Sequence, residues 1–203
     1  MAEGKPLVAA RVFGSVVSGM HGTDAAGVLS WTQAYLRWAL AWAGQPVDVA
    51  TPIVAPPQGQ LLAPRIEFVQ IMATAEMGMI REARRLALDF AEHAESVGHH
   101  GAALHAIHLA GRIQVTRNLV ERAEAFDSHV EGDLAIIIRD HLGALAVSDG
   151  AGLEKVAERF ETSGHLALAH EAFANASKSH VEGGSQRSAR RSEPRLVDLM
   201  ALG

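Results

Sequence analysis

Turn-forming residues recur along the chain at nearly constant intervals, and this spacing restricts the possible folds more than any other feature. Gly78, Gly111, Asp149 and Gly183 follow one another at intervals of 33, 38 and 34 residues. Repeats of this length with two helices in each are typical of helical-hairpin arrays. A single hairpin buries little apolar surface, whereas stacked hairpins share a continuous core. We therefore expect stacked antiparallel helical hairpins.

The residues between the turns favour helices and not strands. In the segment 80–94 the apolar residues fall on one helical face; they are Ile80, Ala83, Ala87, Phe90, Ala91 and Ala94. No run alternates with a period of two, as a half-buried strand would. The sequence predicts an all-α protein with about ten helices. Their expected ranges are 6–20, 24–43, 66–77, 80–97, 100–114, 117–126, 134–147, 153–163, 166–181 and 185–200.

Proline and capping residues suggest how the chain is divided. Five of the seven prolines lie in the segment 45–64, where they disfavour helix and favour extended backbone. We therefore expect an N-terminal helical pair at 1–44, a Pro-rich linker at 45–64 and a hairpin array at 65–203. The second helix has Thr23 or Asp24 as a candidate N-cap, and Gly44 should end it.

Composition excludes several classes of protein. The chain of 203 residues has no cysteine, which rules out disulfides, thiolate zinc sites and cysteine nucleophiles and favours the cytoplasm. Its net charge of -5 gives no electrostatic basis for nonspecific nucleic-acid binding. The apolar stretch from Leu7 to Met20 is interrupted by Arg11 and is shorter than the roughly 20 residues that span a membrane. We expect a cytoplasmic chain that binds neither membranes nor, by itself, nucleic acid.

Two segments carry a resemblance to a known family. Met72–Leu88 (MATAEMGMIREARRLAL) looks like a tetratricopeptide-type hairpin. Residues 149–164 (DGAGLEKVAERFETSG) and 166–176 (LALAHEAFANA) resemble the tetratricopeptide-like helical arm of large LuxR-type transcriptional regulators from actinobacteria. The resemblance covers roughly Ile66 to Arg191. It implies a right-handed solenoid that senses a signal or binds a protein.

The resemblance does not extend to the family's other modules. In those regulators the arm lies between an ATP-binding module and a C-terminal helix-turn-helix. This chain has no Gly-x-x-x-x-Gly-Lys-Ser/Thr phosphate loop, and it ends at Gly203, where the DNA-binding module should follow. We therefore expect a non-catalytic regulatory or interaction module without a cofactor. Its partner would be a protein or a small-molecule effector, and a homodimer is a further option.

An aromatic stripe is the first candidate site. Trp31, Tyr35, Trp38 and Trp42 stand at i, i+4, i+7 and i+11, so all three tryptophans and the only tyrosine share one helical face. Such a face either packs against neighbouring helices or forms a small-molecule pocket or a dimer interface. Arg37 lies beside the stripe and could contact an anionic group. We predict that these five residues bind the ligand or partner.

A group of histidines is the second candidate site. His105 and His108 are three residues apart on one expected helix, a spacing that can chelate zinc or nickel, and His100 could be a third ligand. A metal-dependent hydrolase that uses residues 99–108 is therefore an alternative function. The pattern lacks the His-Glu-x-x-His signature of zinc proteases. Polar histidines around a turn at Gly98–Gly101 would explain it equally well.

Charged residues give two further patterns. Clustered carboxylates alternate with cations, which predicts solvated helix faces with local ion pairs; the residues are Glu121, Glu124, Asp127, Glu154, Glu158, Arg122, Lys155 and Arg159. A basic tail could contact nucleic acid or an acidic partner, or form the polar cap of the last repeat; it contains Arg187, Arg190, Arg191 and Arg195.

Overall fold

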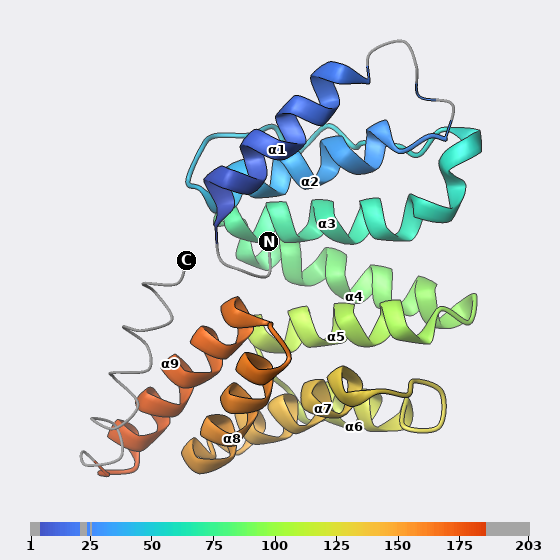
Figure 1. Ribbon diagram of the computed structural model, residues 1–203. Coiled ribbons are helices and arrows are strands. Elements are labelled where there is room, and N and C mark those ends of the chain that lie inside the picture. Colours follow the sequence, from blue (N-terminus) through green and yellow to red (C-terminus); the bar gives the residue numbers. More distant parts are fainter. Residues whose placement is uncertain (1–4, 21–23, 25, 186–203) are drawn as a thin grey trace. The chain divides into compact units, whose positions relative to one another are not determined.

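The computed structural model describes residues 5–20, 24 and 26–185, and these are all-helical, which confirms the predicted class (Figure 1). They form nine α-helices and one short 3₁₀ helix, and no strand occurs among them. The helices are α1 (Pro6–Gly19), α2 (Leu29–Trp42), η1 (Pro57–Leu62), α3 (Ala63–Glu76), α4 (Ile80–Ser96), α5 (His100–Ile113), α6 (Arg117–Ala125), α7 (Asp133–Ala146), α8 (Gly150–Thr162) and α9 (Leu166–Glu182). The basic tail and the expected last helix beyond Ser185 lie outside the described residues.

The chain divides into two compact units, and the division falls within α5, between Ala110 and Gly111. In the first unit α1 packs on α2, α2 on α3 and α3 on α4 (Figure 1). In the second unit α6 packs on α7, α7 on α8 and α8 on α9. Consecutive helices therefore pair within each unit, as hairpins do. The right-handed solenoid and the expected domain boundaries remain predictions.

Six of these helices end in the same way. The second and third residues after each helix donate hydrogen bonds to carbonyls of its last turn, as in a Schellman motif. At the end of α3, Gly78 donates to the carbonyl of Ala75 and Met79 to that of Thr74. Five of the six have glycine at the turn, with φ between 71° and 78°. These glycines are Gly44, Gly78, Gly98, Gly164 and Gly184. At the end of α7 the position is occupied by Ser148, with φ 53°.

Two predicted boundaries are wrong in detail. Gly111, expected to precede a turn, lies inside α5, and a Cβ added there would stand 2.3 Å from Leu142 Cδ2. A close neighbour, not a turn, accounts for this glycine. The helix α2 starts at Leu29, later than expected, and the Asp24 carboxylate accepts hydrogen bonds from the backbone N–H groups of Val28 and Leu29 at 2.8 and 3.1 Å.

The Pro-rich segment packs within the first unit. The backbone of Ile53 exchanges two hydrogen bonds with the Gln70 side chain of α3, at 2.6 and 3.0 Å. Ala55 is buried in the same core as Tyr35 of α2 and Ile66 of α3. The segment therefore lines the hydrophobic core shared by α2 and α3.

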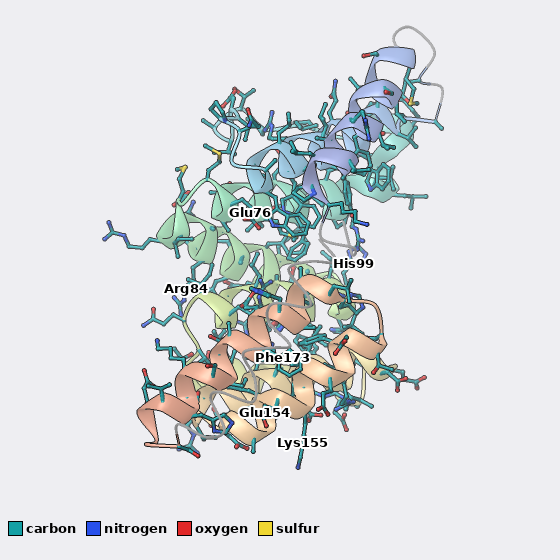
Figure 2. The ribbon with its side chains drawn as sticks, turned by 60° about the vertical axis from the view of Figure 1, so that its left-hand side comes forward. Glu76, Arg84, His99, Glu154, Lys155 and Phe173 are labelled. Atoms are coloured by element: carbon teal, nitrogen blue, oxygen red, sulfur yellow. The ribbon has the colours of Figure 1, made fainter. Side chains whose placement is uncertain are left out.

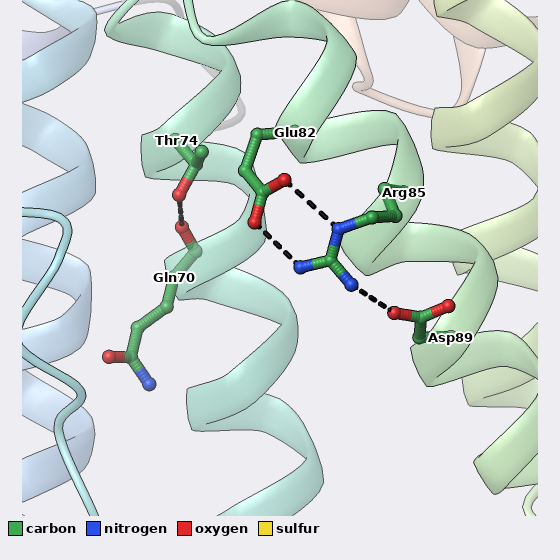
Figure 3. Close-up of polar contacts among 5 residues, drawn as sticks. All are labelled: Gln70, Thr74, Glu82, Arg85 and Asp89. Atoms are coloured by element: carbon green, nitrogen blue, oxygen red, sulfur yellow. Dashed lines mark hydrogen bonds and ion pairs between the residues drawn. The ribbon is translucent and has the colours of Figure 1, made fainter.

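The helix α4 shows how the sequence pattern becomes packing. Most of its predicted apolar face is buried, namely Ala83, Ala87, Phe90, Ala91 and Ala94, while Ile80 is 44% exposed. On the outer face Arg85 binds the carboxylates of Glu82 and Asp89 (Figure 3). The hydrogen bonds and charge of Arg85 lower the pKa of Glu82. Among the described residues, no helix combines the length and apolar character needed to cross a membrane.

Candidate binding groove

Tyr35 of the aromatic stripe is buried in the core of the first unit, and Trp31 and Trp38 pack against this core while partly exposed. Ring centroids follow one another at 4.7 Å from Trp31 to Tyr35, 5.9 Å to Trp38 and 6.0 Å to Trp42. Phe13 of α1 completes the cluster at 5.5 Å from Tyr35, a contact that the sequence pattern does not reveal. The Tyr35 hydroxyl accepts a hydrogen bond from Arg65 Nε at 2.8 Å. These contacts give the stripe a packing role, and its ligand-binding role remains a prediction.

Arg37 is held by its own unit. Its Nη1 donates to the Thr51 carbonyl at 2.6 Å, and the nearby Asp48 accepts backbone hydrogen bonds from Ala50 and Thr51. Partial burial lowers the pKa of Arg37, and the charge of Asp48 opposes that change. The described contacts thus direct this guanidinium to the Pro-rich segment.

The histidines of the second candidate site lie in different surroundings. His108 is almost fully buried in α5, and the ring of His105 lies 6.3 Å from that of Phe68. Within the described ranges, no three His, Cys, Asp or Glu side chains stand close enough to hold a metal ion.

A groove in the second unit is the candidate functional site. It has a volume of about 720 Å³, is open to solvent and lies along α7 and α8 beside the end of α6. We call it the α6–α8 groove. Its lining residues are Glu124, Asp127, Arg139, Asp140, Gly143, Ala144, Val147, Asp149, Gly152, Lys155, Val156 and Arg159.

The floor of the α6–α8 groove is apolar and partly bare. Ala144 and Val156 are buried and lie beside Gly143 and Gly152. A Cβ added to Gly143 would meet no atom within 4 Å. Glycine inside a helix costs about 1 kcal/mol relative to alanine, and no packing among the described residues requires it here. Gly143 therefore leaves space in the groove at the expense of stability.

Charged side chains surround this floor. Arg139 pairs with Asp127 at 2.7 Å, and Arg159 of α8 pairs with Asp140 of α7. Lys155 extends outward from α8 and has no ion pair among the described residues (Figure 2). Both ion pairs described in the groove therefore join different elements, whereas the sequence predicts local pairs within helices here.

A buried polar cluster supports α7 from within the second unit. The Arg112 Nε of α5 donates to both carboxylate oxygens of Glu171 on α9, at 2.8 and 2.9 Å. Burial raises the pKa of Glu171, but the charge and hydrogen bonds of Arg112 lower it by a larger amount. The pKa of Glu171 therefore lies below its ordinary value. His141 of α7 is fully buried, and its burial lowers its pKa to about 4. This cluster holds α5, α7 and α9 together and does not line the groove.

Comparison with known proteins identifies no relative. No family model, no curated protein and no solved structure matches the chain. The candidate function is therefore argued from the geometry of the groove.

Proposed function

We propose that the chain is a non-catalytic interaction module that binds a segment of a partner protein in the α6–α8 groove. The observation that carries the proposal is an open groove of about 720 Å³ with an apolar floor and a charged rim. Interfaces of this kind combine an apolar centre with polar surroundings. Gly143 lowers helix stability without a packing reason. This supports the proposal, because the missing Cβ keeps the floor free for an approaching chain.

The charged groups of the groove are suited to recognition. Acid–base catalysis requires carboxylates in a desolvated site with separated pKa values. Here the Asp127 and Asp140 side chains are 79% and 50% exposed, and both already bind arginines. Both members of the Arg159–Asp140 pair are partly exposed, so this pair can exchange partners with a ligand at little energetic cost.

The resemblance to the arm of LuxR-type regulators gives this binding a context. We propose that the module belongs to a cytoplasmic regulator and that partner binding shifts the packing of α7 against α8. Arg159 of α8 and Asp140 of α7 connect these two helices across the groove rim. A ligand that competes for either side chain would therefore favour one arrangement of the hairpin over another.

Site-specific photo-crosslinking in cells that express the protein tests this proposal. A benzoylphenylalanine at Lys155 should capture a defined partner, whereas the same group at Met79, which is 47% exposed in the first unit, should not. Gly143→Leu should abolish the Lys155 product, because the larger side chain fills the floor. Identical products from both positions, or a Lys155 product that Gly143→Leu does not change, would show that the groove is not the binding site.

A further inference from the structure

The outer face of α1 is apolar and exposed. This helix packs on α2 in the first unit, and only Ala10 of its 14 residues is fully buried (Figure 1). Four large apolar side chains of α1 face solvent; Leu7, Val8, Val12 and Val16 are 65%, 45%, 54% and 40% exposed. No other described helix exposes more than one such side chain. Val8, Val12 and Val16 stand four residues apart, so they form one ridge along the helix, which we call the valine ridge.

The valine ridge is accompanied by positive charge. Lys5 immediately precedes α1, Arg11 precedes Val12, and both cations are exposed. The segment 5–20 contains no Asp or Glu. The outer face of α1 is therefore basic and apolar, and it is suited to a surface that is acidic and apolar.

The α6–α8 groove has this complementary chemistry. Its floor is apolar, and its cation Arg139 is only 13% exposed. All the carboxylates that line the groove are exposed, namely those of Glu124, Asp127, Asp140 and Asp149. Lys155 and Arg159 oppose them, but residues 111–185 contain twelve Asp and Glu against seven Lys and Arg, a net charge of -5. This part of the molecule therefore attracts a basic helix and repels an acidic one.

The two surfaces also match in length. The valine ridge from Val8 to Val16 and the α7 wall of the groove from Arg139 to Val147 each advance by eight residues, or about 12 Å of helix. Helices pack by inserting such a ridge between the side chains of their neighbours. Gly143 lies midway along the α7 wall, and a Cβ there would meet no atom within 4 Å. The floor therefore has room for branched side chains.

We infer that α1 of one copy of the chain binds in the α6–α8 groove of a second copy. The valine ridge lies on the floor, and Lys5 and Arg11 face the carboxylates of the rim. The two surfaces differ, so the contact is heterologous and copies can add to one another head to tail. The contact is weak, because a single helix buries less than the about 800 Å² per partner of a standard interface. The inference rests on the proposed function and names the partner as a second copy of this chain.

Sedimentation equilibrium of the full chain over a range of concentrations tests the inference. The wild type should associate increasingly as its concentration is raised, and added salt should weaken the association. Val12→Asp should raise the dissociation constant at least about tenfold, because it places a carboxylate on the apolar floor. Val97→Asp makes the same change at the end of α4, where the side chain is 51% exposed, and should leave the association unchanged.

Mixing two defective variants separates this contact from other modes of association. Gly143→Leu fills the floor but keeps α1, whereas Val12→Asp keeps the groove. Each variant alone should be monomeric, and their mixture should form a 1:1 complex. Glu124→Lys changes an exposed side chain at the rim and is a second groove variant that leaves the packing intact. It should weaken self-association and should also form a complex with Val12→Asp. Recovery in a mixture shows that both variants are folded.

The other outcomes overturn the inference. These are a wild type that stays monomeric, a Val12→Asp or Glu124→Lys variant that associates like the wild type, and mixtures that stay monomeric. Photo-crosslinking from Lys155 distinguishes this failure from that of the proposed function. A product with a second copy supports both ideas. A product with another protein that Gly143→Leu abolishes overturns only the inference, and a product that Gly143→Leu does not change overturns both.

Discussion

Ser148 shows how a single backbone position affects stability. It has a φ of 53° at the end of α7, where five other helices have glycine. A residue with a Cβ is strained in this left-handed region by about 1 kcal/mol, and glycine is not. Ser148→Gly should therefore raise the free energy of unfolding by about 1 kcal/mol, as measured by urea denaturation.

The reverse change at an equivalent turn provides the control. Gly164 has a φ of 78° and no atom within 4 Å of an added Cβ, so Gly164→Ala introduces backbone strain without a clash. It should lower the free energy of unfolding by about 1 kcal/mol. Equal stabilities of Ser148→Gly and the wild type would mean that Ser148 is not held in this conformation in solution.

Residue patterns reveal the aromatic stripe but not the α6–α8 groove. Trp31, Tyr35, Trp38 and Trp42 share a face because helical spacing is local, and the structure does bring their rings together. The groove comes from three helices and uses ordinary arginine, lysine and carboxylate side chains. The burial of Arg139 depends on other elements, so no local pattern signals it.

At the scale of elements, glycine has two structural roles that the sequence alone does not separate. Gly78 and Gly98 follow helices in a left-handed conformation, as a turn signal suggests. Gly111 instead lies within α5 and allows Leu142 of α7 to approach. Turn signals therefore predict most helix boundaries here, but they fail where a neighbouring helix requires a missing Cβ.

This difference predicts opposite effects of two alanine substitutions in α5. Gly111→Ala places a methyl group against the fully buried Leu142, and the strain of about 1–3 kcal/mol exceeds the gain in helix propensity. It should destabilise the protein by about 1 kcal/mol. Gly101→Ala meets no atom within 4 Å and should be neutral or stabilising by up to about 1 kcal/mol. Thermal unfolding of both variants checks the signs, and a stabilising Gly111→Ala would contradict the close packing of α5 on Leu142.

At the scale of the whole molecule, the free energy of unfolding should depend on pH through His141. Burial lowers its folded pKa to about 4, whereas an unfolded histidine titrates near its ordinary value of 6.5. As the pH falls below about 6.5, the unfolded chain takes up a proton that the folded chain does not accept. The stabilisation is therefore complete above pH 6.5 and is lost progressively as the pH falls from 6.5 to 4.

The expected loss is about 1 kcal/mol between pH 7 and pH 5.5, and it approaches about 3 kcal/mol near pH 4. The first interval separates His141 from most carboxylates, which titrate at lower pH. Urea denaturation at both pH values measures the loss. His141→Phe should remove most of the pH dependence, because no titrating ring remains beside Glu171 and Arg112, whereas replacing the exposed His99 with Gln should retain it. If His141→Phe kept the full pH dependence, another titrating group would be responsible. The neutral, buried imidazole of α7 would then not couple stability to pH.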